Sequence, residues 1–289
     1  MKQNELQKTF IAMLFAFVVA AAAQQIAELL IVATKNWTAA TTPGEILESI
    51  HDHAWPLIAA ATHSILALLL VSTSWIMWSK SQGGGHVGDI EDIISVKYVV
   101  LLLEVLLVTL YFAIVKSSEA DFAGYTKENS ISAFVKSPSA RPEAIQMLWI
   151  FTVFAAWDYL VDVFNSPRTP APSGWTEAIS SHVQGVMTYC LVSLLCAAGA
   201  ALVIFASPAK GSAYQAIFGD VALISLLLLF VRGKKLEFYL YKIFPKEISR
   251  SNTKRTSAPT AKNLAFTTAL IVIFLSFTFL TGLPPCALE

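Results

Sequence analysis

The feature that most constrains this chain is an apolar run of membrane-spanning length that recurs from one end of the sequence to the other. One example, VKYVVLLLEVLLVTLYFAIVK at 96–116, surrounds a single acid, Glu104. A helix needs about 20 mostly apolar residues to cross the hydrocarbon core of a bilayer. Of the 289 residues, 55% are hydrophobic and 14% are charged, whereas soluble domains carry about 25% charge. The sequence therefore predicts an all-α, polytopic integral membrane bundle, formed as a single transmembrane domain over 1–289.

Seven segments are predicted to cross the membrane, and polar connectors containing Gly, Pro and Ser separate several of them. The first segment, with basic residues before an apolar run and small residues after it, is similar to a secretory signal, and we expect it to remain as a signal-anchor helix. The predicted spans are 10–33, 56–78, 94–115, 145–164, 183–206, 214–231 and 264–283.

The placement of lysine and arginine predicts the orientation, because cytoplasmic loops carry an excess of these residues. The connector 232–262 holds nine of the chain's 20 basic residues and two acids, so it is predicted to be a cytoplasmic connector. Alternation of the seven spans then places the N-terminus in the cytoplasm and the C-terminus outside it. We expect the protein to lie in a bacterial inner (plasma) membrane.

Glu104 falls near the middle of its predicted span, where a charge costs about 2.5–3.5 kcal/mol and each Leu, Val, Ile or Phe returns about 0.3–0.6 kcal/mol. The apolar neighbours outweigh that cost, so the segment inserts despite the acid. Hydrophobicity alone gives no reason for Glu104 to be there. Ionisable groups inside membrane spans commonly mark ion or proton pathways.

Further polar groups fall inside the other predicted spans and form a series in depth. The outer third of the membrane holds Glu28, His63 and Asp220, the centre holds Glu104, and the cytoplasmic side holds Asp158 and Asp162; Lys97 lies two turns from Glu104 on its helix. Because carboxylates and imidazole exchange protons and bind cations, these seven residues are the predicted ion or proton pathway. The alternative for each is a structural role, in packing, at a helix end or in an ion pair such as Lys97 with Glu104.

The basic connector supports two interpretations. Its bases alternate with Leu, Phe, Tyr and Ile, so the segment could lie on the inner leaflet with its cations on anionic headgroups. It could instead dock an acidic surface of a partner. The residues predicted to contact lipid or a partner are Lys234, Lys235, Lys242, Lys246 and Arg250. Nucleic acid is not expected, because the patch is short and adjoins the membrane.

Motifs of catalysis and cofactor binding are absent from the sequence. Cys190, Cys196 and Cys286 form no CxxC or Cys/His spacing, and no nucleotide-binding, HExxH or GxSxG pattern occurs. The sequence therefore indicates no catalytic residue, no cofactor and no metal site. A small-residue pair, Ala197 and Ala201 around Gly199, permits close helix packing within the bundle or between protomers of a homo-oligomer.

These observations favour a membrane transport protein: a channel or proton-coupled carrier for a small cation that uses intramembrane carboxylates. The main alternative is a non-conducting subunit or partner-docking membrane protein whose buried acids are structural. An integral-membrane enzyme acting on lipid is favoured less. It would require Glu28, His63 and Asp220 to converge within about 3–5 Å around an open pocket.

Overall fold

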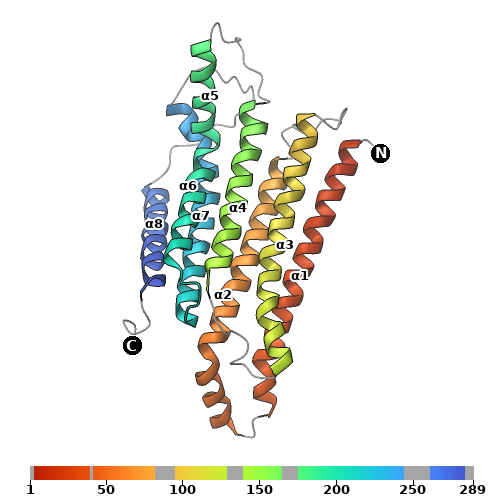
Figure 1. Cartoon of the computed structure of the whole chain (residues 1–289), viewed down its shortest axis with the longest axis vertical. Coiled ribbons are helices and arrows are strands. Elements are labelled where there is room, and N and C mark those ends of the chain that lie inside the picture. Colours follow the sequence, from red (N-terminus) through yellow and green to blue (C-terminus); the bar gives the residue numbers. More distant parts are fainter. Residues whose placement is uncertain are drawn as a thin grey trace.

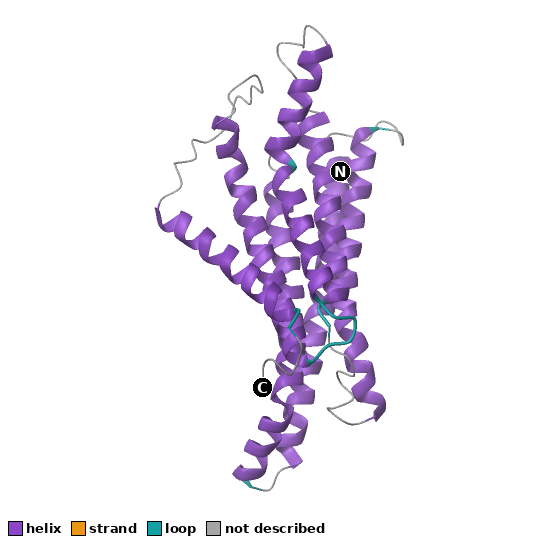
Figure 2. Ribbon diagram, turned by 60° about the vertical axis from the view of Figure 1, so that its left-hand side comes forward, coloured by secondary structure: helices purple, strands orange, loops and turns teal. Residues whose placement is uncertain are grey.

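A computed structural model of the chain describes residues 3–39, 42–81, 95–128, 139–164, 175–243 and 261–283. In these ranges the protein is all-helical, and the turned view shows helices and loops without a strand (Figure 2). The helices are α1 Gln3–Ala39, α2 Pro43–Ser81, α3 Val96–Glu128, α4 Arg141–Asp158, the π-helical turn η3 Tyr159–Phe164, α5 Trp175–Tyr189, α6 Leu191–Ala206, α7 Ala213–Ile243 and α8 Ala261–Thr281. This confirms the predicted helical bundle.

Most of the helices run along the long axis of the molecule, with α1 at one edge and α8 at the other (Figure 1), and α8 is inclined to the rest in the turned view (Figure 2). The end at which α1 begins is called the upper end here, and the end at which α8 ends is called the lower end. α4 packs on α6 and α3, and α7 packs on α8, α2 and α6. α7 and α4 are the most deeply buried of the six candidate spans in the part of the chain that the structure describes.

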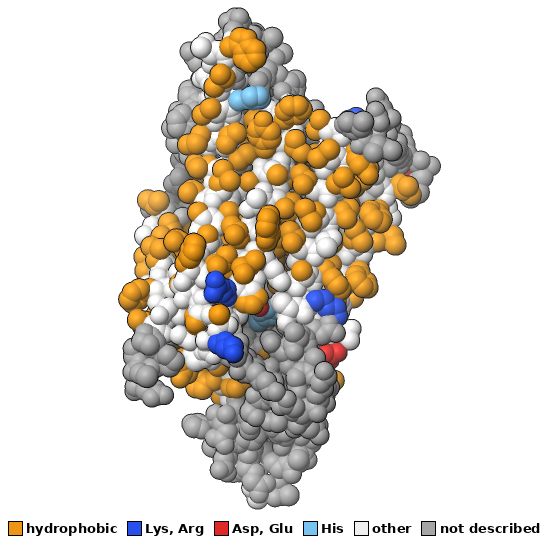
Figure 3. Space-filling model, in the orientation of Figure 1, with side chains coloured by type: hydrophobic (Ala, Val, Ile, Leu, Met, Phe, Trp, Pro, Cys, Tyr) orange, Lys and Arg blue, Asp and Glu red, His pale blue; other side chains and the backbone are white. Residues whose placement is uncertain are grey.

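Six helices are long and apolar enough to cross a membrane, and a bent pair brings the number to seven if that pair counts as one span. The six segments are Glu5–Ile31, Ala54–Ser79, Val96–Ser117, Arg141–Phe164, Ala213–Leu236 and Asn263–Thr281. Figure 3 shows hydrophobic side chains over most of the middle of one face, as expected where a helix bundle contacts lipid. These features support a membrane protein.

The bent pair replaces the single straight span predicted at 183–206. Ile179–Tyr189 and Leu191–Ala206 meet at 58°, with Cys190 between them. The sequence around the bend, MTYCLVSLL, contains neither Gly nor Pro and is mostly apolar. It therefore gives no local indication that the helix breaks at Cys190. A helix broken at membrane depth needs partners for its freed backbone groups, because lipid supplies none.

The core between α4 and α7 is apolar for most of the membrane thickness. On α4, Met147, Phe151 and Phe154 recur at helical spacing and are buried, and Leu223 and Leu227 do the same on α7. A Cβ on Gly199 of α6 would lie 2.8 Å from Cδ1 of Leu226 on α7. The predicted small-residue face of this helix therefore packs within the chain at Gly199.

Candidate functional site

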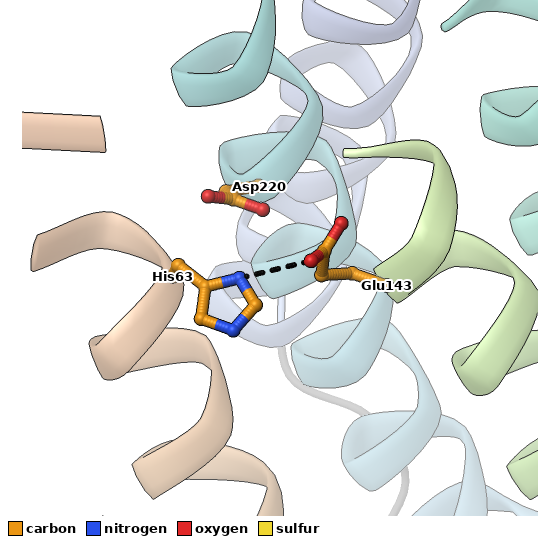
Figure 4. A group of neighbouring side chains, drawn as sticks. All are labelled: His63, Glu143 and Asp220. Carbon is orange, nitrogen blue, oxygen red and sulfur yellow. Dashed lines mark ion pairs between the residues drawn. The ribbon is translucent and has the colours of Figure 1, made fainter. Parts of the chain in front are cut away.

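Three buried ionisable side chains from three helices meet in the lower half of the bundle. His63 of α2, Glu143 of α4 and Asp220 of α7 are 6%, 7% and 3% exposed. One ligand atom from each lies within 4.8 Å of one from each of the others, and Figure 4 shows the side chains converging. His63 Nδ1 lies 3.2 Å from Glu143 Oε1. We call these three residues the lower cluster.

The second ring nitrogen of His63 is fixed by α3. Nε2 lies 3.3 Å from the carbonyl oxygen of Ile114 and 3.3 Å from Oγ of Ser117, whose hydroxyl donates to Ile114 at 2.7 Å. A carbonyl only accepts, and the serine proton is already donated, so Nε2 is the N–H donor. The tautomer thus follows from the hydrogen-bond network, and it directs Nδ1 at Glu143.

The pairing of His63 with Glu143 has a chemical consequence. A carboxylate oxygen and an imidazole Nδ1 lone pair are both acceptors. Two acceptors 3.2 Å apart in a buried site require a cation between them, either a proton or a metal ion. The other carboxylate oxygen of Glu143, Oε2, is buried and has no hydrogen-bond partner among the described residues. The lower cluster therefore has the ligands and the need for a bound cation.

Asp220 reaches the cluster because α7 approaches the start of α4 closely. A Cβ on the preceding residue, Gly219, would overlap Cβ of Ala140, so only glycine permits this approach. Thr62 Oγ1 lies 3.2 Å from Asp220 Oδ2 and donates to the Ala59 carbonyl at 2.9 Å. The acid is thus held from α2 as well as from its own helix.

Hydrogen bonds tie together the helix ends below the cluster. Ser139 Oγ donates to the carbonyl of Pro208 at 2.6 Å, which joins the start of α4 to the segment between α6 and α7. Gln215 Nε2 donates to the carbonyl of Leu283 at 2.7 Å, and its Oε1 accepts from the Ser212 N–H at 2.9 Å. These contacts join the start of α7 to the end of α8 and fix the lower end of the site.

A second polar site lies towards the upper end, at the break between α5 and α6. Lys234 Nζ of α7 lies 2.6 Å from Asp158 Oδ2 and donates to the carbonyl of Tyr189 at 2.9 Å. Ser193 Oγ donates to the same carboxylate oxygen at 2.8 Å. Lysine thus satisfies a carbonyl at the helix break, and Asp158 balances its charge. We call Asp158, Lys234, Ser193 and the Tyr189 carbonyl the upper lock.

The upper lock coincides with two irregular stretches of backbone. Asp158 is the last α-helical residue of α4, and the π-helical turn η3 follows it directly. π-Turns occur often at functional sites. Asp162 lies in this turn and is partly exposed, close enough to act on Asp158 as a like charge.

Glu104 lies apart from the lower cluster. It is 8% exposed, and its carboxyl group lies beside the indole N–H groups of Trp78 on α2 and Trp157 on α4. Lys97, which the sequence offered as a possible ion-pair partner of Glu104, is half-buried two turns earlier on α3. Glu104 thus lies where α3 faces α2 and α4.

Glu28 does not join the lower cluster either. It is partly exposed on α1, where it accepts a hydrogen bond at 3.0 Å from Nε2 of Gln24, one turn away. The integral-membrane enzyme considered above would require Glu28, His63 and Asp220 to converge. Among the described residues, His63 and Asp220 lie together with Glu143, and Glu28 is not part of this group.

The predicted lipid- or partner-contacting bases fall in different places. α7 continues to Ile243, so the predicted connector begins as helix, and Lys234 turns inward to the upper lock. Lys235 is exposed. The side chain of Lys242, and Lys246 and Arg250 altogether, lie outside the residues that the structure describes.

Glu143 is the member of the lower cluster that sequence reasoning missed, because its segment reads as a polar connector. The signal that could have found it is ARPEA, which has Pro142 in the first turn of a helix and an acid directly after it. That pattern is typical of a helix start. It would have placed Glu143 on a helix, without indicating burial against His63.

Packed side chains separate the lower cluster from the upper lock. Glu143 and Asp158 are 15 residues apart on α4, and Asp220 and Lys234 are 14 apart on α7, or about 21–22 Å along each helix. Ile150, Phe151 and Leu227 are at most 1% exposed in this interval. The structure therefore has two polar sites with an apolar layer between them.

No protein-family model, curated protein or solved structure matches the chain.

Proposed function

We propose that the protein is a carrier for a small cation, with the lower cluster as its ion-binding site and the upper lock as the closure on the other side. The observation that carries this proposal is the convergence of His63, Glu143 and Asp220, three buried ionisable groups from separate helices. Burying such groups costs several kcal/mol for each ion unless the charge is compensated. A bound cation would compensate the buried negative charge, which gives the site a reason to bind one.

The apolar layer favours a carrier over an open channel. Ile150, Phe151 and Leu227 fill the space between the two polar sites, and a conducting path would need water-accessible groups there. Alternating access opens one site at a time through helix movement, and broken helices are common where carriers bind ions. The bend at Cys190 and the π-turn after Asp158 are the places where α5 and α4 could move with least loss of helical hydrogen bonds.

We infer the orientation from the distribution of charge. The basic connector at 232–262 includes the upper end of α7 and the residues that follow it in the sequence, so the upper end is proposed to face the cytoplasm. The lower cluster would then receive ions from outside. This arrangement suits a bacterial inner membrane.

The proposal moves the central ion site from Glu104 to the lower cluster. Glu104 is buried beside Trp78 and Trp157, which offer donors that suit one carboxyl group. His63 and Glu143, in contrast, need a cation between them. Asp158 remains in the pathway, as the acid that holds Lys234.

One observation favours a different function, that of a non-transporting membrane subunit. Asp158 is neutralised by Lys234, and Glu104 is enclosed by two indole groups, as expected for acids that fix helix packing. In that case the lower cluster would be a third structural contact.

Flux through proteoliposomes separates these functions. The purified protein is reconstituted with a pH-sensitive dye or a metal-sensitive dye inside, and an ion gradient is applied. We expect flux in wild type and at least about a tenfold loss in Asp220→Asn, which keeps the side-chain shape and removes the charge. Glu5→Gln, the same chemical change at an exposed position on α1, is the matched control. Equal flux in empty and protein-containing vesicles would exclude the carrier.

A further inference from the structure

The lower cluster has a ligand set that narrows the class of cation. Two carboxylates and one imidazole are contributed by Glu143, Asp220 and His63. Imidazole suits first-row transition metals, whereas Mg²⁺ and Ca²⁺ prefer oxygen ligands alone. Two carboxylates carry two negative charges, so a divalent ion makes the buried site neutral. A monovalent ion would leave one negative charge in a low-dielectric interior.

We propose that His63, Glu143 and Asp220 bind one divalent first-row transition-metal ion, of the Mn²⁺, Fe²⁺, Co²⁺ or Zn²⁺ class. The inference rests on the proposed function in that it names the cation for the same site. Metal binding itself does not depend on transport.

The distances already fit such an ion. Metal–nitrogen and metal–oxygen bonds of about 2.0–2.2 Å place neighbouring ligand atoms about 2.8–3.1 Å apart in an octahedral site and about 3.3–3.6 Å apart in a tetrahedral one. His63 Nδ1 and Glu143 Oε1 are 3.2 Å apart, and all three ligand atoms lie within 4.8 Å of one another. Binding of one ion by all three residues then requires Asp220 to move towards His63 and Glu143. The metal takes the position of any proton between Nδ1 and Glu143, and that proton leaves to solvent.

The surroundings of His63 supply independent support. A histidine that ligates a metal through one nitrogen usually donates its other N–H to a carbonyl or carboxylate, which fixes the ring. His63 does this from Nε2 to the carbonyl of Ile114, with Ser117 beside it. The buried Glu143 Oε2, which has no hydrogen-bond partner among the described residues, is a second oxygen for the ion. An ion pair fixed only for packing would not need either feature.

The test uses Co²⁺ as a spectroscopic probe on the full chain, purified in detergent and freed of metal with a chelator. We expect one Co²⁺ per chain with visible d–d absorption, displaced by Zn²⁺, and a higher Tm of the wild-type protein with metal than without it. His63→Gln, Glu143→Gln and Asp220→Asn should each weaken Co²⁺ binding by more than about 100-fold, beyond the 10–100-fold typical of outer-shell changes. Ser117→Ala should weaken it by about tenfold, and Glu5→Gln should not change it.

The outcomes are distinguishable from those of the flux experiment. Absence of stoichiometric Co²⁺ binding to the wild-type chain, with no metal-dependent rise in Tm, would overturn the inference even if a variant failed to fold. If proton flux still depended on Asp220, the proposed transport function would hold, with the proton as the transported ion. Co²⁺ bound at the cluster by a protein that moves no ion would support the metal site and remove the transport function. Equal binding in wild type and all three ligand variants would place the metal elsewhere and overturn the inference.

Discussion

At the residue scale, buried charges in this protein are held in two different ways. Lys234 and Asp158 neutralise one another, and each has a further partner, the Tyr189 carbonyl and the Ser193 hydroxyl. His63 and Glu143 meet through atoms that both accept, with Asp220 close by. The first arrangement is complete without a ligand, and the second needs a proton or a metal ion. The difference decides which site we assign to binding and which to closure.

The upper lock gives a prediction about stability. Asp158→Asn leaves the Lys234 ammonium buried and uncompensated, which costs about 3–5 kcal/mol. We expect a clear fall in Tm for Asp158→Asn and for Lys234→Met, measured by thermal melting in detergent. The double variant removes both charges and should recover much of the loss. A double variant whose loss equals the sum of the two single losses would show that the pair is not coupled.

At the element scale, glycines determine how closely the helices approach. Gly219 lets α7 contact the start of α4, where an added Cβ would meet the Cβ of Ala140, an atom attached directly to the backbone. Gly199 is also crowded, but its neighbour is Cδ1 of Leu226, the far end of a flexible side chain. The contact at Gly219 positions Asp220 in the lower cluster, and the contact at Gly199 is part of the apolar packing between α6 and α7.

A pair of glycine variants separates those roles. Gly219→Ala should push α7 from α4, move Asp220 away from Glu143 and weaken Co²⁺ binding by at least about tenfold, in the range of outer-shell effects. Gly199→Ala should lower stability by about 1–3 kcal/mol through overpacking and leave Co²⁺ affinity unchanged. Co²⁺ titration and thermal melting measure the two effects. Loss of Co²⁺ affinity in both variants alike would mean that the site responds to general loosening of the bundle.

The individual helices show how far the sequence could predict the structure. Apolar length predicts helices that cross the membrane, because every backbone group must be satisfied within lipid. The bend at Cys190 could not be predicted in this way, because the run around it contains neither Gly nor Pro, and the lysine that binds the Tyr189 carbonyl at the bend comes from another helix. His63 and Asp220 were predicted as a pathway from their depth alone. Glu143 was not, because its burial depends on helix contacts that no local pattern encodes.

At the scale of the whole molecule, the basic connector and the two polar sites define a direction. The predicted connector 232–262 begins within α7 at the level of the upper lock, and the lower cluster lies in the opposite half of the bundle. Lys234 was predicted to contact lipid or a partner, and it lies in the interior against Asp158. In the proposed orientation, Lys235 and the bases that follow it in the sequence provide the topological signal.

Reporter fusions test that direction in a bacterial host. A fluorescent protein inserted between residues 250 and 260 should fluoresce, because it would fold in the cytoplasm. Alkaline phosphatase fused after Glu289 should be active, because it would lie outside. The exchanged pair of fusions serves as the control and should be silent. Activity of the exchanged pair would invert the orientation.

The packed interval between the two sites, about 21 Å along α7, has an electrical consequence. We expect most of the voltage across the bilayer to fall over this interval, because water and polar groups screen the field at either side. Moving one charge through the full potential is worth about 2.3 kcal/mol per 100 mV, and a divalent ion doubles that. Transfer of such an ion from the lower cluster past the upper lock should therefore produce a current that responds steeply to voltage, unless compensating charge moves with it.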